Sequence, residues 1–379
     1  MKRYGNLYEK IYDIENLEIA HMMAKRDKSY YKEVKMVNTE PLLYLTRIQR
    51  MLQDKTYTIK SNDYSHQIIN DKGKERELMK LPYYPHRIIQ WAIMLQIEHI
   101  FLEVLVPHAC ASIPDRGIKN VYNYITRWLK TDKENTKYVL QMDVRKFYPS
   151  IDHKILKQLL RKKFKDKDLL WLLDLIIDSY PSEKGVPIGS YLSQYLANFY
   201  LAYLDHYIED ELNVKYMVRY MDDILVFSSN KEELHDVRKK TEKYLSSKLN
   251  LKLKDNYQVY PVDKRGVSFV GYRYFRNYVL LKKTSLKRIK RLSNKIQNKF
   301  KENKLITYKE FCAMNSYAGW ACWTNDYRFF EKWIKPIRFS LYDYYNKRIC
   351  KYKPKYQIIH KSMRYRHKFL RKQERKRHD

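Results

Sequence analysis

The sequence predicts an α+β fold in which a small antiparallel sheet carries helices on one face. Residues 138–142 form a short apolar run typical of a buried strand, and residues 215–228 contain two short strands joined at 221–223. Residues 85–106 are strongly apolar with helical periodicity, which indicates a core helix. The strands are therefore grouped in the middle of a chain whose flanks are helical.

The remaining elements follow from local patterns. Residues 1 to about 60 are expected to be helical and basic, and a hairpin is expected within 61–81. Asp152 is expected to cap the helix after the first strand of the sheet, because its carboxylate can accept hydrogen bonds from free backbone N–H groups. The further expected elements, in chain order, are a helix at 121–130, a loop at 185–189, a long helix to about 212, an amphipathic helix at 230–249, two or three strands within 252–281, and basic helices from about 285 onward.

The charge of the chain predicts a polyanionic partner. The chain has 76 Lys and Arg and 43 Asp and Glu, which gives a formal net charge of +33. Self-repulsion on this scale is tolerated when a polyanion neutralises it. Nucleic acid is the first expectation, and an anionic membrane surface is the second. The start, MKRYGNLYEK, lacks the apolar stretch of a signal peptide, and no apolar run reaches the length of a membrane-spanning helix. The four cysteines show no CxxC or zinc-site spacing, so we expect reduced thiols and a cytoplasmic location.

Three aspartates form the strongest candidate for a chemical site. Asp143 ends the first predicted strand of the sheet, and Asp222 and Asp223 occupy the tip of the predicted hairpin. Neighbouring carboxylates between apolar strands resist joint ionisation, and a bound divalent cation removes that cost. Two Mg²⁺ ions held by such carboxylates can activate a 3′-hydroxyl and stabilise a leaving pyrophosphate. The alternative for any Asp-Asp pair is a solvated turn, which needs neither flanking apolar strands nor a third aspartate.

These motifs resemble those of reverse transcriptases. Tyr220-Met221-Asp222-Asp223 matches the YxDD box of that family. Asp143-Val144, Phe147-Tyr148 and Ser150-Ile151-Asp152 resemble the first palm motif of its bacterial, group II intron-like branch. The resemblance extends from about Tyr4 to about Tyr327, and it implies an RNA-directed DNA polymerase, a nucleotidyltransferase that makes DNA on a template RNA from dNTPs.

The resemblance also implies an organisation and a set of metal ligands. The expected organisation is a right-hand polymerase fold, with N-terminal helices and fingers at 1–137, a palm at 138–282, a helical thumb at 283–350 and a basic C-terminal tail at 351–379. By implication Asp143, Asp222 and Asp223 are the catalytic residues. Together with the backbone carbonyl of Val144 they would bind two Mg²⁺ ions, which Mn²⁺ can replace.

One further motif resembles the reverse transcriptases of diversity-generating retroelements. Residues 185–194, GVPIGSYLSQ, carry Ile188-Gly189 and Ser193-Gln194 where most relatives read PQG followed by SP. The subfamily's usual Asn-Leu-Thr is Ser190-Tyr191-Leu192 here, and the basic tail extends beyond its usual end. The resemblance implies copying errors opposite template adenine, a structured non-coding RNA and an oligomeric accessory protein. Two other functions are considered for the chain. One is a phage-defence reverse transcriptase that acts with a non-coding RNA, and the other is a non-enzymatic RNA-binding scaffold.

The incoming nucleotide is expected to contact residues from several segments. Lys74 and Arg76 lie in the predicted hairpin, where basic side chains suit a triphosphate, although a solvated charged turn is the alternative. Tyr148 is a candidate steric gate beneath the sugar, or else a core aromatic beside Phe147. The further expected contacts to the nucleotide are Ile188, Gly189 and Gln194.

Primer and template contacts are expected elsewhere. The expected residues are Arg116, Ser193, Gly271 and Tyr272. Gly189, Ser193 and Ala197 recur at helical spacing, so this small-residue face is expected either along a duplex or in helix packing. Arg87 matches a basic family position for structural or template contacts. Lys252 and Lys254 both lie near the place where the family brings a lysine to the pyrophosphate, and the sequence leaves the choice open.

Overall fold

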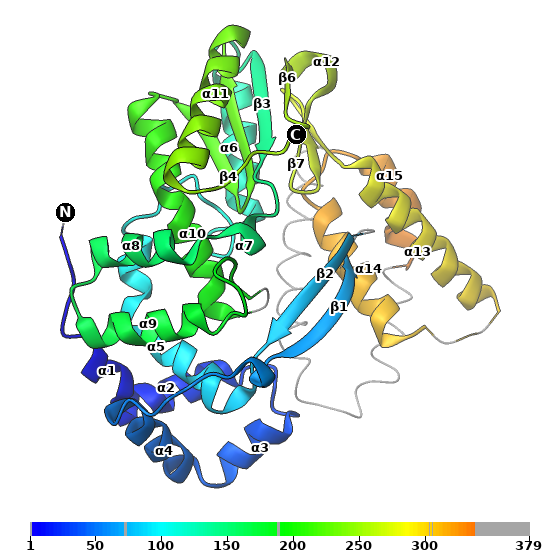
Figure 1. The fold of residues 1–379 in the computed structure, drawn as a ribbon. Coiled ribbons are helices and arrows are strands. Elements are labelled where there is room, and N and C mark those ends of the chain that lie inside the picture. The colour runs from blue at the N-terminus through cyan, green and yellow to red at the C-terminus, as the bar shows by residue number, and fades with distance from the viewer. Residues whose placement is uncertain (1, 72–73, 188–189, 303, 305, 338–379) are drawn as a thin grey trace. The chain divides into compact units, whose positions relative to one another are not determined.

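The computed structural model describes residues 2–71, 74–187, 190–302, 304 and 306–337. The chain forms two compact units (Figure 1). The first unit comprises residues 1–270 and 275–277, and the second comprises 271–274 and the chain from 278 onward. Mixed helices and small antiparallel sheets confirm the predicted α+β class.

The first unit begins with a group of packed helices. They are α1 (Tyr8–Tyr12), α2 (Ile14–Ala24), α3 (Lys32–Thr39), α4 (Pro41–Gln53) and α5 (Ile88–Leu102). The predicted core helix is α5, which packs against α2 and α10 and buries side chains on all sides. Its apolar sequence explains this, because a helix that is hydrophobic all round has no face for solvent. The predicted hairpin is confirmed as β1 (Ser65–Asp71) paired antiparallel with β2 (Lys74–Lys80).

The predicted strands form a four-stranded antiparallel sheet in the order β4-β5-β3-β6. Its strands are β3 (Tyr138–Asp143), β4 (Tyr216–Tyr220), β5 (Asp223–Ser228) and β6 (Gln258–Pro261). Helix α11 (Lys231–Lys248) packs against β3 and β5, and α6 (Ile118–Thr131) packs against β4. Residues of β4 and β5 are almost all buried, and those of β3 are buried or half-buried, as their apolar sequences require.

Four α-helices lie in the described part of the chain between β3 and β4. They are α7 (Phe147–Ser150), α8 (His153–Lys163), α9 (Lys167–Asp178) and α10 (Tyr191–His206). Asp152 caps α8 as predicted, because its side chain accepts a hydrogen bond from the Ile155 N–H. Helix α10 contacts α5, α8 and α11, and twelve of its residues are buried. It therefore connects the helical group to the sheet.

The strands after α11 differ from expectation. Two or three were predicted within 252–281, whereas the described residues there contain β6, β7 (Val267–Phe269), β8 (Tyr272–Tyr274) and β9 (Val279–Leu281), together with the short helix α12 (Val262–Arg265). Three of these strands have only three residues each, which is too short for an alternating pattern to separate them.

The second unit contains the β8–β9 pair and a group of helices. Its helices are α13 (Lys283–Lys301), α14 (Tyr308–Ala321) and α15 (Tyr327–Trp333). Thr307 and Glu310 form a capping box at the start of α14. A small core of Ile296, Ile306, Phe311, Met314 and Ile337 holds this unit together. Across the described parts of both units, no helix is long and apolar enough to cross a membrane.

Candidate active site

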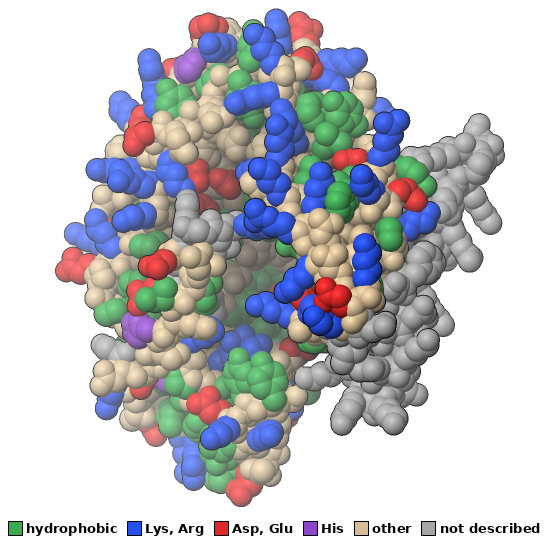
Figure 2. Space-filling model, turned by 90° about the vertical axis from the view of Figure 1, so that its right-hand side faces the viewer, with side chains coloured by type: hydrophobic (Ala, Val, Ile, Leu, Met, Phe, Trp, Pro, Cys, Tyr) green, Lys and Arg blue, Asp and Glu red, His purple; other side chains and the backbone are tan. Residues whose placement is uncertain are grey.

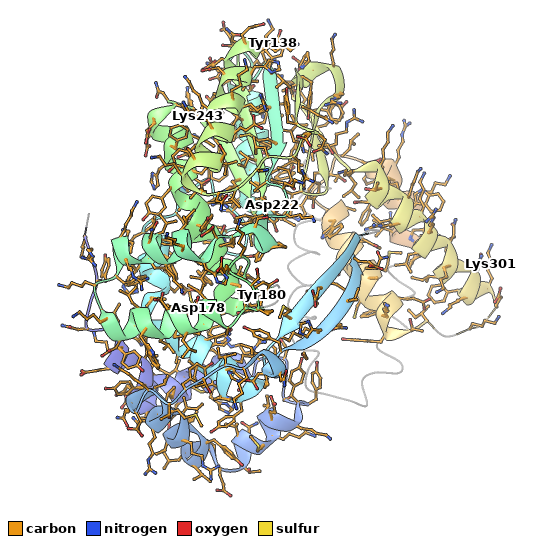
Figure 3. All side chains as sticks on the ribbon, in the orientation of Figure 1. Tyr138, Asp178, Tyr180, Asp222, Lys243 and Lys301 are labelled. Atoms are coloured by element: carbon orange, nitrogen blue, oxygen red, sulfur yellow. The ribbon has the colours of Figure 1, made fainter. Side chains whose placement is uncertain are left out.

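A tight hairpin positions Asp222 and Asp223. Strands β4 and β5 pair up to Tyr220 and Asp223, so Met221 and Asp222 form the turn between them. Met221 has φ of 56°, which matches the positive φ required at the first position of a type I′ or II′ hairpin turn. Figure 3 shows Asp222 and Tyr138 at opposite ends of the sheet. The aspartates therefore lie at one end of a buried sheet.

The third aspartate lies on the adjacent strand. In the β3–β5 register Asp143 is directly opposite Asp223, and the Val144 N–H donates a 3.1 Å hydrogen bond to the Asp222 carbonyl. Directly opposed residues in an antiparallel pair have Cβ atoms about 4.5–5.5 Å apart. The structure thus brings Asp143, Asp222 and Asp223 together, although Asp143 and Asp222 are far apart in the sequence.

The electrostatics of these aspartates suit a divalent cation. Burial, followed by the charges of Asp143 and Asp222, raises the pKa of Asp223 to about 7. Burial and the charge of Asp143 also raise the pKa of Asp222. One oxygen of Asp143, Oδ1, is buried without a hydrogen-bond partner in the described structure. Carboxylate oxygens are the donors that Mg²⁺ prefers, so the chemistry of this set fits that ion.

The carboxylates are not arranged as a closed metal cluster in this conformation. Within the part of the chain that is described, no three His, Cys, Asp or Glu side chains are grouped so as to hold a metal ion. Instead the Lys254 ammonium forms an ion pair with Asp143 Oδ2. Of the two lysines that the sequence left open, Lys254 contacts Asp143, whereas Lys252 is exposed.

A buried ion pair supports the hairpin. Arg219 and Asp205 are both fully buried, and two guanidinium nitrogens of Arg219 donate to the two carboxylate oxygens of Asp205 at 2.7 and 2.6 Å. Arg219 also donates to the Met221 carbonyl at 3.0 Å and to Asn198 at 3.1 Å. These bonds link the turn to α10. Sequence reasoning missed this pair, although an arginine in an apolar strand was an available signal, because buried charges require partners.

Tyr148 lies close to the hairpin turn. Its hydroxyl is 3.8 Å from Met221 Sδ, and its ring contacts Phe147 edge to face. Burial and the negative charge of Asp222 raise the pKa of Tyr148 to about 12, so the phenol stays protonated at neutral pH. The half-buried position of Tyr148 is compatible with both interpretations, a steric gate for the sugar and a core aromatic beside Phe147.

The other predicted nucleotide contacts are only partly described. Lys74 and Arg76 lie on β2, where Arg76 pairs with Ile69, but their side chains are outside the described structure. Ile188 and Gly189 are also outside the described residues, and Gln194 is half-buried on α10.

The predicted primer and template residues are dispersed. Arg116 donates to the Val106 and Ala109 carbonyls at 2.7 and 3.3 Å, so it holds its own loop. Ser193 is buried on α10, so a duplex contact would require that helix face to be uncovered. Gly271 and Tyr272 belong to the second unit. Gly271 has φ of 87°, and the Tyr272 hydroxyl donates to the Trp320 carbonyl at 3.2 Å.

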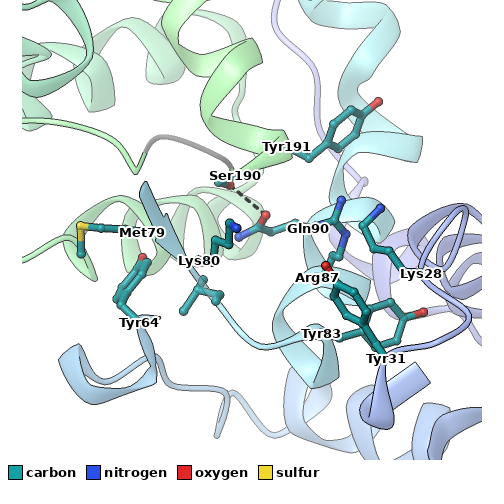
Figure 4. Close-up of a pocket in the computed structure, with 11 residues that line it drawn as sticks. Lys28, Tyr31, Tyr64, Met79, Lys80, Tyr83, Arg87, Gln90, Ser190 and Tyr191 are labelled. Carbon is teal, nitrogen blue, oxygen red and sulfur yellow. Dashed lines mark hydrogen bonds between the residues drawn. The ribbon is translucent and has the colours of Figure 1, made fainter. Parts of the chain in front are cut away.

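A separate pocket of about 220 Å³ lies within the first unit (Figure 4). Its lining includes Lys28, Lys80, Arg87 and four tyrosines, and none of its lining residues is acidic. Burial, followed by the charge of Arg87, lowers the pKa of Lys28. The Arg87 Nε atom is buried without a hydrogen-bond partner among the described residues. Ser190 donates to Gln90 at 2.9 Å at the edge of this pocket.

Comparison with known proteins defines the class to which this fold and site belong. The family model described as "Reverse transcriptase (RNA-dependent DNA polymerase)" matches residues 60–274, more than half of the chain. The chain therefore belongs to the reverse transcriptase family, as its motifs predicted. Protein YkfC of Escherichia coli (strain K12) is 22% identical over 252 residues, which cover 55% of this chain and 65% of YkfC. The chain thus matches slightly less than two thirds of that relative's length.

Proposed function

We propose that this protein is an RNA-directed DNA polymerase, a nucleotidyltransferase that copies an RNA template into cDNA. The observation that carries the proposal is the opposition of Asp143 and Asp223, with Asp222 in the adjoining turn, in a member of the reverse transcriptase family. These aspartates are the proposed catalytic residues and metal ligands, with the Val144 carbonyl as a further ligand. In this assignment the β1–β2 hairpin belongs to the fingers, the four-stranded sheet to the palm, and α13 to α15 to the thumb.

The proposed cofactor is a pair of Mg²⁺ ions, which Mn²⁺ can replace. Bound there, the ions would stabilise negative charge on the attacking and leaving oxygens of the transfer. Lys74 and Arg76 are proposed to contact the triphosphate, and Tyr148 to contact the sugar. Ile188, Gly189 and Gln194 are proposed to lie beside the new base pair.

The charge of the protein supports a nucleic-acid substrate. Lys and Arg side chains are spread widely over the face shown in Figure 2. The pocket lined by Lys28, Lys80, Arg87 and tyrosines offers cations for phosphate and rings for bases, which suits a single strand. Arg116, Gly271 and Tyr272 are the proposed contacts to primer and template, and Ser193 would join them only if the covered face of α10 became exposed.

Primer extension with the separate variants Asp222→Asn and Asp223→Asn tests the proposed activity. Each change removes one charged metal ligand, so synthesis on a primed RNA template in Mg²⁺ should fall by roughly 100-fold or more. Folding should survive, because repulsion among the carboxylates is relieved. Asp236→Asn on the exposed face of α11 is the matched control and should extend primers normally. Near wild-type extension by either site variant would refute the assignment.

The finer proposal is an enzyme of a diversity-generating retroelement. It is supported by the GVPIGSYLSQ motif at 185–194, in which Ile188 replaces the usual glutamine. Such an enzyme would act in the cytoplasm with a structured non-coding RNA and an oligomeric accessory protein. An apolar side chain beside the new base pair loses a polar contact, which favours misincorporation opposite template adenine.

The variant Ile188→Gln tests this subtype. The added amide should restore a polar contact, so errors opposite template adenine should fall several-fold, while errors at the other template bases should change less. Sequencing of the cDNA made on a defined RNA by both proteins measures the error spectrum. An unchanged spectrum at adenine would contradict the diversity-generating role and favour the phage-defence alternative.

A further inference from the structure

The position of Lys254 is set by a short segment held against β3. Val144 and Leu253 form an antiparallel bridge, in which the Lys254 N–H donates to the Asp143 carbonyl and the Arg145 N–H donates to the Lys252 carbonyl, both at 2.8 Å. Leu251 and Leu253 anchor this segment in the main core. Two backbone hydrogen bonds and two buried leucines therefore hold the Lys254 backbone beside Asp143, where the ammonium can reach its carboxylate.

Lys254 balances charge where three carboxylates meet. Its ammonium pairs with Asp143 Oδ2, while Asp143 Oδ1 is buried without a partner among the described residues. Both side chains of the pair are only 27–29% exposed, so water screens them incompletely. The charge of Lys254 also lowers the pKa values of Asp222 and Asp223, against the larger effects of burial and of Asp143. The Lys254 ammonium thus neutralises part of the same charge that a divalent cation would neutralise.

We propose that Lys254 is a stand-in cation, by which we mean that its ammonium takes the place of the metal ion beside Asp143 and competes with the metal for this carboxylate. In the metal-free protein the ammonium neutralises Asp143, and a metal ion reaches this carboxylate only when the Lys254–Asp143 ion pair breaks. The inference rests on the proposed metal site and adds a residue that sets its affinity.

Thermal melting of Lys254→Gln, with and without metal, tests the competition. In EDTA the variant should melt a few degrees below wild type, because Asp143 loses the Lys254 ammonium and stays partly buried. When melting is followed in a MnCl₂ titration, the Mn²⁺ concentration that half-saturates the variant should be roughly fivefold lower than for wild type. A fivefold change corresponds to about 1 kcal/mol, because a tenfold change in a binding constant is about 1.4 kcal/mol. Lys252 is exposed and lies two residues before Lys254. The control variant Lys252→Gln therefore removes an equal charge and should change neither the melting temperature in EDTA nor the half-saturating Mn²⁺ concentration.

A double-mutant cycle ties both effects to Asp143. In an Asp143→Asn background, Lys254→Gln should no longer lower the melting temperature in EDTA, because the ion pair is already absent. A drop of the same size in both backgrounds would overturn the proposal, and so would an unchanged or higher half-saturating Mn²⁺ concentration. If Lys254→Gln does not fold, Lys254→Arg replaces it. A guanidinium binds a carboxylate more strongly than an ammonium, so that variant must raise the half-saturating concentration.

These measurements contain no primer, template or nucleotide, so they are independent of polymerase activity. Competition in a protein that does not extend primers would leave the stand-in role intact and refute only the proposed function. Primer extension without any Lys254-dependent change in Mn²⁺ binding would refute only the stand-in role.

Discussion

Tyr148 is the proposed steric gate for the choice of sugar. It is half-buried, close to Met221 in the hairpin turn, and its pKa is raised to about 12 partly by the charge of Asp222. In the proposed role the aromatic ring lies beneath the ribose and leaves no room for a 2′-hydroxyl. We therefore propose that Tyr148 acts by steric exclusion.

The variant Tyr148→Ala should admit ribonucleotides. Removal of the ring opens space below the sugar, so rNTP use relative to dNTP use should rise roughly tenfold or more, about 1.4 kcal/mol of lost discrimination. Tyr148→Phe keeps the ring and should retain the preference for dNTPs. Single-nucleotide incorporation with matched rNTP and dNTP measures the ratio, and equal ratios in the Ala variant and wild type would place the gate elsewhere.

At the scale of elements, the hairpin of β4 and β5 depends on α10. Arg219 on β4 pairs with Asp205 near the end of α10, and it also donates to Asn198 and to the Met221 carbonyl. Arg219, Asp205 and Asn198 are buried, so water cannot replace a lost partner among them. The ion pair therefore fixes the turn that carries Asp222 to the helix behind it.

Loss of this pair should destabilise the first unit strongly. Arg219→Met leaves the Asp205 carboxylate buried and unpaired, so the free energy of unfolding should fall by about 3–5 kcal/mol. The control is Arg161→Met, which breaks the more exposed Arg161–Asp174 pair and should cost about 0–1 kcal/mol. Urea unfolding of the two variants measures both costs, and equal values would contradict a special contribution from the buried pair.

At the scale of the whole molecule, the excess of positive charge is the dominant feature. The formal net charge of +33 includes twelve Lys or Arg in the basic tail, residues 351–379, against Glu374 and Asp379. The tail lies outside the described residues, so its role is a prediction from sequence. Tyr352, Tyr356, Tyr365 and Phe369 are interleaved with these cations, which offers both charge and stacking to RNA.

Deletion of residues 351–379 should weaken RNA binding and reduce its salt dependence. The slope is that of the logarithm of the RNA-binding constant against the logarithm of the salt concentration. Each lost phosphate contact should make this slope shallower by roughly 0.7 to 0.9, because fewer counterions are released. Extension of a simple primed template at saturating RNA should largely survive, because the tail contains none of the proposed catalytic residues. Binding measured over a salt series for both proteins gives the slopes, and identical slopes and affinities would show that the tail does not contact RNA.

The sequence by itself determined the class, the main elements and the three aspartates. Apolar runs marked β3, β4 and β5, and helical periodicity marked α5, because burial of side chains repeats along a strand or helix and is visible locally. Asp143, Asp222 and Asp223 were predicted together because charged residues at the ends of apolar strands are costly without a shared function.

Only the tertiary structure decided which partners these residues have. Lys254 and Asp143 are 111 positions apart, so no local pattern distinguishes Lys254 from the equally basic Lys252. The buried Arg219–Asp205 pair joins a strand to a helix, and Ser193 on α10 is covered by packing. Local sequence reports which residues prefer burial, but charge pairing and the covering of a surface depend on which segments meet, and that is fixed only when the chain folds.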